Sequence, residues 1–387
     1  MKQIKKLAFR FKKDRLVIGI LGLIFCSFII VRADFSHIAP EQQFVVERGR
    51  VLAIHLENIW ADAYIPTLEV GAQVVDVEVL SGPFSGEVVR VEHELSRFQN
   101  FHLRENQNIL ISHFPYEEEL TVYNTSIYGP SRGPVLFIAI GLLLVGMLVV
   151  GRSKGFYAII SLAFTFTVII CLLIHGIVTG GNPIFLSLVT SLLIISFTTG
   201  MISGATREAI AAILGALVGL IIAGLVSVLL GQFSHISGIH LESVRHVLYH
   251  TPPETFIRIP DLFFAVVIIA TTGAMIDSTI SLASTVSELK VQSPKITCFK
   301  LYESSMQVGR SVLGANVNTL ILAFTGTSLV TILLIVLFGF SHFRIINLEL
   351  VAIEIIQGTA AIVSILTAIP ATALFASYLA TKEKIEK

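Results

Sequence analysis

Long apolar stretches set the pattern of hydrophobic and polar positions along this chain. A helix of about 20 apolar residues crosses a hydrocarbon core about 30 Å thick, and there only helices or closed barrels satisfy the backbone polar groups. The pattern therefore predicts eight membrane-spanning helices. Their expected ranges are Leu16–Val31, Pro134–Val150, Phe156–Val178, Ile184–Ile202, Ile210–Leu230, Leu262–Ser287, Leu320–Phe340 and Leu348–Leu379.

Residues 33–133, between the first two apolar stretches, show strand signals instead. At residues 75–79 valine alternates with acidic residues, which is typical of a half-buried strand. A turn rich in glycine, serine and proline follows at 81–86, and residues 87–93 alternate again. Five or so short strands joined by such turns predict a small β-barrel or sandwich. The further strand candidates are Phe44–Leu56, Asn108–His113 and Leu120–Thr125.

Composition and lysine placement extend this picture to location. The chain of 387 residues is 54% apolar and 14% charged, whereas soluble domains carry about 25% charged residues. All twelve lysines lie before the first stretch, in alternate connections or after the last stretch. By the positive-inside rule this predicts a plasma-membrane protein with both termini in the cytoplasm. The expected parts are a basic tail 1–15, a first helix 16–32, an extracytoplasmic β domain 33–133, a seven-helix bundle 134–381 and a tail 382–387.

The first apolar stretch has a second interpretation as a cleaved signal, because basic residues precede it. A cleavage site needs small residues before the cut, in an Ala-x-Ala pattern. The stretch ends at Ile29-Ile30-Val31-Arg32-Ala33 instead, which favours an uncleaved anchor.

The predicted β domain is strongly acidic. Residues 33–133 hold fifteen Asp or Glu against six Arg and no Lys, a net charge of −9. This balance argues against a nucleic-acid partner for this face. The region holds none of the three cysteines, so a disulfide is not expected there.

The sixth stretch carries the strongest candidate for chemistry. Gly273, Asp277, Ser281, Ser284 and Glu288 recur at spacings of four, four, three and four, so they share one helix face. A carboxyl group deep in a membrane helix is costly and usually functional, which predicts a proton or cation site at Asp277. The alternative is a neutral carboxylic acid that hydrogen-bonds a neighbouring helix and holds the bundle together.

Two later stretches supply partners for Asp277. Glu354 and Gln357 share one face of the last stretch, and Asn318 lies near the inside end of the seventh. The alternatives are structural: Glu354 could reach lipid headgroups, and Asn318 could bond across helices.

Small residues at spacings of four predict close helix contacts. Gly200 with Gly204, and Gly215 with Gly219, follow this pattern, and Gly273 is a further packing candidate.

Motifs for metal binding or hydrolysis are weak. His246 and His250 are four residues apart and would share a helix face, yet no third ligand is evident beyond Glu242 or Glu254. The Gly-Pro-Ser-Arg-Gly segment at 129–133 fits a nucleophile-elbow pattern but joins the β domain to a membrane helix, so we interpret it as a linker. We therefore predict no metal, no cofactor and no enzyme.

The residues around Asp277 also carry a resemblance to a known family. Several segments of the chain resemble those of the bacterial YibE/F-like integral membrane proteins. They are Gly273–Asp277, Ser281–Ser284, Glu288-Leu289, Val308–Arg310, Asn318–Phe324, Glu354-Ile355 and Ile369–Ala373. The resemblance covers roughly residues 134–381, and the β domain looks like that of the longer, YibE-type members. Ser311 stands where many members carry an acidic residue.

The resemblance implies no established activity, but it implies a partner. Longer members often pair with a shorter one that lacks the outside domain, so we expect a homo-oligomer or a complex with a shorter family member, embedded in the lipid bilayer.

These patterns together favour a secondary transporter of a small solute or ion. The alternative is a receptor or scaffold whose β domain binds a partner while the helices anchor and oligomerise. The expected proton, cation or substrate path consists of Asp277, Glu354, Asn318, Gln357, Ser281 and Ser284.

Overall fold

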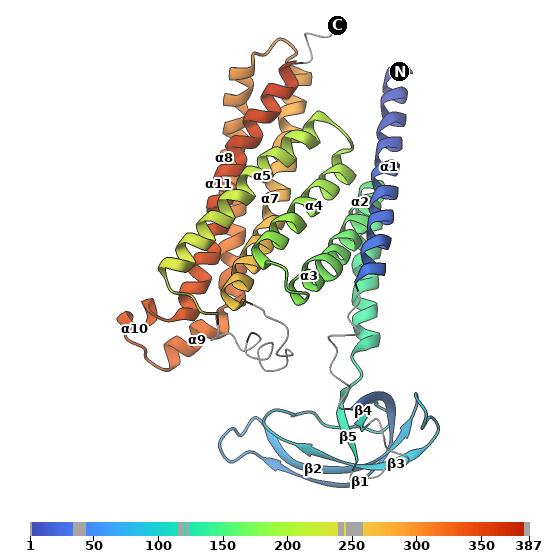
Figure 1. Cartoon of the computed structure of the whole chain (residues 1–387). Coiled ribbons are helices and arrows are strands. Elements are labelled where there is room, and N and C mark those ends of the chain that lie inside the picture. The colour runs from blue at the N-terminus through green and yellow to red at the C-terminus, as the bar shows by residue number, and fades with distance from the viewer. Residues whose placement is uncertain are drawn as a thin grey trace. The chain divides into compact units, whose positions relative to one another are not determined.

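The computed structural model describes residues 2–33, 44–114, 120, 124–238, 244 and 258–382. It divides into two compact units. The first, which we call the helical unit, comprises Met1–Phe35 and Met147–Lys387; the second, the β unit, comprises Ser36–Gly146. Figure 1 labels the elements of both units in chain order.

The β unit is a five-stranded antiparallel sheet with strand order β3-β2-β1-β4-β5, curved into a half-barrel. A small all-β domain is therefore confirmed. Its alternating valines, such as Val75, Val77 and Val79, are fully buried in one core with Ile109 and Ile111. The strands are β1 (Val45–Ala61), β2 (Glu69–Val79), β3 (Val88–Leu95), β4 (Asn108–His113) and β5 (Thr125–Pro130).

Strand β1 is 17 residues long and pairs with both β2 and β4. Its register with β2 shifts after Val51 and again after Ile54. Such irregularities bend a strand and increase its twist, which curves the sheet. Trp60, the only tryptophan of the chain, pairs with Val70 near the end of β1 and is 56% exposed.

The other regular elements of the described chain are helices. The helices are α1 (Lys2–Arg32), α2 (Gly133–Val168), η1 (Ile169–Ile174), α3 (His175–Val178), α4 (Pro183–Ser203), α5 (Arg207–Phe233), α7 (Ile259–Gln292), α8 (Cys298–Thr327), α9 (Leu329–Leu337), α10 (His342–Ile346) and α11 (Glu349–Thr381).

The eight predicted spans are not confirmed. Within the described residues, five helical segments are long and apolar enough to cross a membrane, or six if α8 and α9 count as one span. The apolar part of α1, Val17–Arg32, is shorter. The predicted span Leu320–Phe340 is not one continuous helix, because the helix axis bends by 57° between α8 and α9. Helix α8 also begins earlier than predicted, at Cys298.

Arg152 interrupts the long apolar segment Gly133–Val178. Its backbone angles, φ 47° and ψ −126°, lie outside the helical region. A Cβ atom on Gly155 would lie only 1.9 Å from the carbonyl oxygen of Met147, although residues eight apart in a straight helix are about 12 Å apart. The chain therefore turns back on itself at Arg152, in the loop that the sequence places between its second and third apolar stretches.

Closely apposed small residues form the interior of the helical unit. A Cβ atom on Gly215 of α5 would lie 1.9 Å from the hydroxyl oxygen of Thr372 in α11, and one on Gly219 would lie 2.8 Å from the Cβ of Ala368 and from the carbonyl oxygen of Ser364. Small residues permit such an approach of two helix backbones. The α5–α11 contact is thus the centre of the unit.

The other predicted glycine pair divides between two roles. A Cβ atom on Gly200 would lie 3.2 Å from the side chain of Ile18, so α4 passes close to α1 there. Gly204 has φ 74° and is the C-cap of α4, where its amide bonds the carbonyl of Gly200. Gly204 therefore ends the helix, and it is buried there.

Candidate functional site

Helix α7 turns its predicted polar face outward. Gly273, Asp277, Ser281 and Glu288 are exposed and Ser284 is half-buried, and nothing lies within 4 Å of a Cβ placed on Gly273. The opposite side of α7 is buried against other helices of the helical unit. Its buried residues include Thr272, Met275, Thr279 and Leu282. No described residue therefore covers the face of α7 that carries Asp277.

Helix α8 carries a second outward polar stripe. Its buried side consists of Leu301, Ser305 and Gly309, and its outward residues recur at helical spacing. We call the outward set the α8 stripe; it comprises Glu303, Gln307, Ser311, Gly314, Asn318 and Thr325, all exposed. Nothing lies within 4 Å of a Cβ placed on Gly314, so this stripe too is open in the described chain.

A hydrogen bond sets the depth of Asp277 relative to the α8 stripe. The amide of Asn316 donates to the hydroxyl of Ser278 across 2.6 Å. Asp277 therefore lies about level with Asn316, within one helical turn of Asn318. The sequence interpretation singled out Asn318 and overlooked Asn316, although the two amides stand only two residues apart in an apolar stretch.

A second polar contact joins α7 to α4. The hydroxyl oxygens of Thr272 and Ser191 lie 2.8 Å apart, and both side chains are buried. Interhelical hydrogen bonds of this kind average about 0.6 kcal/mol in membrane proteins. This contact and the Ser278–Asn316 bond hold α4 and α8 on either side of α7.

Glu354 lies in a cavity of about 370 Å³ formed by α8, α9 and α11. Its Oε2 atom is buried and has no hydrogen-bond partner among the described residues. Thr325, at the end of the α8 stripe, also lines this cavity. The remaining lining is mainly apolar, with Ile321, Phe324, Ile332, Ile335, Leu350, Val351, Ile355 and Ile362 among its members.

The structure places the two predicted carboxyl groups in different surroundings. Asp277 lies on the open face of α7, and no α7 residue lines the cavity of Glu354. Gln357 is half-buried on α11 and does not line that cavity. The α8 stripe relates the two sites, because it passes the level of Asp277 and its last member, Thr325, lines the cavity of Glu354.

A metal centre finds no support in the described part of the chain. No group of three or more His, Cys, Asp or Glu side chains there could hold an ion. His246 and His250, with Glu242 and Glu254, lie outside the described residues.

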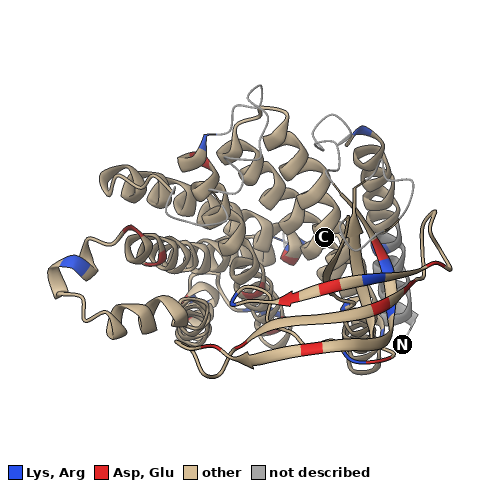
Figure 2. Cartoon of the chain, turned by 90° about the horizontal axis from the view of Figure 1, so that it is seen from below, with Lys and Arg blue, Asp and Glu red and all other residues tan. Residues whose placement is uncertain are grey.

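The β unit arranges its acidic groups differently. Asp62 accepts hydrogen bonds from Arg97 at 2.8 and 3.1 Å and from two backbone amides. Asp76 is bonded by Arg90 at 2.8 Å and by His55 at 2.5 Å. These bonds, above all those from the two arginines, lower the pKa of Asp62 and of Asp76 to about 2. Figure 2 shows Asp and Glu along the strands, whereas most of the helical ribbon carries neither sign of charge.

Comparison with known proteins gives one match. A family model described as YibE/F-like protein matches residues 139–382, well over half of the chain. The match spans α3–α11 and most of α2, and so includes both Asp277 and Glu354. No match was found among curated proteins or among solved structures.

Proposed function

Because this chain belongs to the YibE/F-like protein family, we propose that it is a multi-pass plasma-membrane protein that carries a small solute or ion by secondary transport. Several helices that are long and apolar enough to cross a membrane support a membrane protein. In the proposed orientation both termini are cytoplasmic and the β unit is extracytoplasmic. The support for this orientation is the lysine distribution, since the β unit contains no lysine between residues 36 and 146.

One observation carries the transport proposal: the α8 stripe leads toward the half-buried Glu354, whose Oε2 atom is buried. Polar and small residues recur along α8 from Glu303 to Asn318. Ile321 and Leu322 are exposed on the next turn, and Thr325 then lines the cavity that holds Glu354. A membrane helix that faced only lipid would be apolar on this side. Such a stripe is suited to a hydrated path, with Asn318 in its course and Glu354 as the protonatable group at its end.

Asp277 is the second proposed proton or cation site. It is exposed on α7 beside this path and has no described hydrogen-bond or ion-pair partner, and a carboxyl group in that position is costly against lipid. Ser281 and Ser284, one and two turns along α7, would offer hydroxyl groups to a passing ion.

The open polar faces also support an oligomer. Carboxyl, amide and hydroxyl groups facing hydrocarbon would be costly, and helices from a second chain could cover them. We propose that a second copy, or a shorter member of the family, packs on α7 and α8 and closes the path from the lipid side. No nucleic-acid partner is proposed, because the β unit is acidic.

A flux assay with the full chain in proteoliposomes tests the transport proposal. A pH-sensitive dye inside the vesicles would report proton movement driven by an imposed gradient of candidate cations. We expect the native chain to move protons, and Asp277→Asn and Glu354→Gln each to lower the rate to that of empty vesicles. Glu105→Gln is the matched control, since Glu105 is an exposed acid of the β unit.

The outcomes separate transport from the alternative role. If both carboxyl variants move protons as the native chain does, the assigned sites are wrong. If the native chain moves none of the cations offered, while Asp277→Leu prevents association of the chain with itself or with a partner, the scaffold or receptor role is favoured. The open face of α7 is the observation that supports this second role.

Cysteine labelling tests the orientation separately. In a chain with Cys298→Ser, a cysteine at Lys295 should resist an impermeant thiol reagent applied to intact cells. A cysteine at Glu92, an exposed position of β3, should react. Labelling at Lys295 from outside would overturn the proposed orientation.

A further inference from the structure

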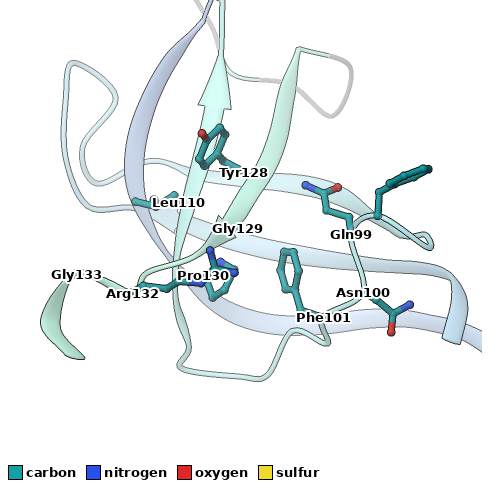
Figure 3. Close-up of a pocket in the computed structure, with 10 residues that line it drawn as sticks. Gln99, Asn100, Phe101, Leu110, Tyr128, Gly129, Pro130, Arg132 and Gly133 are labelled. Carbon is teal, nitrogen blue, oxygen red and sulfur yellow. The ribbon is translucent and has the colours of Figure 1, made fainter. Parts of the chain in front are cut away.

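A pocket of about 540 Å³ lies in the β unit where the last strand passes into α2. One wall is the loop of Phe98, Gln99, Asn100 and Phe101, and the other runs along residues 128–133. Figure 3 shows these side chains around the end of β5, with Gly133 at the first turn of the helix. The pocket and the first turns of α2 belong to the same compact unit.

The beginning of α2 places this pocket at the membrane surface. Val135, Leu136, Phe137 and Ile138 follow directly and are 60–76% exposed. Four consecutive residues point to all sides of a helix, so apolar side chains face outward in every direction. This is the pattern of a helix that crosses a membrane. The hydrocarbon layer therefore begins within about one turn of Gly133, and the pocket lies at the level of the headgroups.

Arg132 provides the pocket with a positive charge that no described residue neutralises. Arg90 and Arg97 form ion pairs with Asp76 and Asp62, but no described carboxylate pairs with Arg132. Its guanidinium group is exposed and suited to two hydrogen bonds with a phosphate.

The side-chain amides of the pocket already donate hydrogen bonds within the protein. The amide of Gln99 donates to the carbonyl of Ile127 at 3.4 Å, and that of Asn100 donates to the carbonyl of Glu69 at 2.5 Å. The phenol of Tyr128 adds one hydroxyl group.

Aromatic rings complete the composition of the pocket. Phe98 is completely exposed, Phe101 is half-buried and Tyr128 is 54% exposed. Aromatic rings are enriched at the headgroup level of membranes, where an apolar body and a polar edge are both favourable. One cation among rings at this depth matches a phosphate attached to a glycerol backbone.

We propose that this pocket binds the headgroup of a phospholipid, with Arg132 on the phosphodiester and the rings of Phe98, Phe101 and Tyr128 around the glycerol. The occupant is a glycerophospholipid of the leaflet that faces the β unit, and phosphatidylglycerol is the probe used to test it. This assignment needs only that α2 enters the bilayer at Gly133, so it stands or falls independently of transport by the helical unit.

Retention of lipid by the purified full chain tests the proposal. The chain would be stripped of lipid in detergent, incubated with phosphatidylglycerol and analysed by native mass spectrometry. Arg132→Gln should retain one lipid fewer, or bind that lipid about tenfold more weakly, because a charged hydrogen bond is lost. The control is Arg104→Gln, since Arg104 is an exposed arginine of the same unit that does not line the pocket.

Two further binding measurements identify which molecule supplies the phosphate. A glucosyl diacylglycerol, which has the same tails but no phosphate, should not occupy the site that Arg132→Gln removes. Glycerol phosphate and inorganic phosphate should compete only weakly, because they lack the acyl chains.

Several outcomes would overturn the proposal. They are equal retention by Arg132→Gln and the native chain, an equal loss in Arg104→Gln, equal binding of the glucosyl lipid, and free phosphate that binds as tightly as the lipid. Fluorescence of Trp60, which lies outside the pocket, would show whether each variant retains a folded β unit. If Arg132→Gln fails to fold, Phe98→Ser removes a fully exposed ring and should weaken retention, whereas unchanged retention in that variant would count against the proposal.

Discussion

Two acids of the β unit and two acids of the helical unit lie in opposite surroundings. In the β unit, Asp62 and Asp76 are each bonded to an arginine, and both act as structural groups. In the helical unit, Asp277 has no described hydrogen-bond or ion-pair partner, and Glu354 keeps a buried oxygen without one. The helical unit is held together instead by apposed small residues of α5 and α11.

The difference teaches where to look for function in each unit. An ion pair in contact with water costs little free energy to form, so its presence requires no functional role. An unpaired carboxyl group within a membrane helix costs free energy that the fold does not recover. Asp277 and Glu354 are therefore candidates for a functional role, whereas Asp62 and Asp76 are candidates for stabilising the fold.

The largest expected effect concerns the small-residue contact. Gly215→Ala should lower the stability of the helical unit by about 3 kcal/mol, because the new Cβ would overlap Thr372 and force α5 and α11 apart. Gly273→Ala is the matched control in an open position, where alanine should stabilise the helix by up to about 1 kcal/mol. Thermal unfolding of the detergent-solubilised variants would measure both changes. Equal melting temperatures for the two variants would contradict the assigned packing.

Loss of a charge pair should affect the β unit less strongly. Asp62→Asn removes the partner of Arg97 and weakens the bonds to the amides of Tyr64 and Ile65. We expect the melting temperature of the β unit to fall by several degrees. The control is Glu92→Gln, because Glu92 is exposed on β3. If the two variants melt alike, the pairing is not structural and the contrast between the units disappears.

The stability of the β unit should also depend on pH in two steps. Burial lowers the pKa of His93 below its ordinary value of 6.5, so the unfolded chain binds a proton more readily and stability falls as the pH drops below about 6.5. The lowered pKa values of Asp62 and Asp76 act in the same direction at lower pH. Their contribution is complete above 3.8 and is lost as the pH falls toward 2.

Urea unfolding at a series of pH values would measure these two steps. His93→Gln should remove the first step and leave the second. A profile that stays flat between pH 7 and pH 5 in the native chain would show that His93 has no such role.

The smallest expected effect tests the acids of the helical unit. Asp277→Asn should leave the melting temperature of the helical unit nearly unchanged, since Asp277 is exposed and no described residue depends on it. Thermal unfolding in the same detergent would check this. A drop as large as that of Gly215→Ala would mean that Asp277 holds the bundle together, and the functional interpretation would lose its basis.

Much of the β unit could be predicted from the sequence because its signals are local. The alternation at residues 75–79 and the glycines of the turn at 81–86 specify strands and a turn over short distances. Membrane helices give a coarser signal, since an apolar stretch does not reveal a bend. The turn at Arg152 lies in the loop predicted between the second and third stretches, whereas the 57° bend between α8 and α9 was absent from the predicted spans.

The candidate site shows the same limit at the level of single residues. Helical spacing correctly groups Asp277 with Gly273 and Ser281 on one face, and it groups Gly215 with Gly219. It does not reveal that the first face is open and the second is closed, because the occupant of a face comes from distant parts of the chain. The cavity around Glu354 depends on the bend after Thr327, and no local pattern gave that bend.

The single tryptophan gives the protein a built-in optical reporter. Trp60 belongs to β1, and the helical unit contributes no other indole. Emission excited near 295 nm therefore originates from the β unit alone, whereas circular dichroism at 222 nm is dominated by the helices. One sample can thus yield two separate unfolding curves without labelling. A shift between these curves would show whether the units melt independently, and a lipid that anchors the strand–helix junction should move the fluorescence curve first.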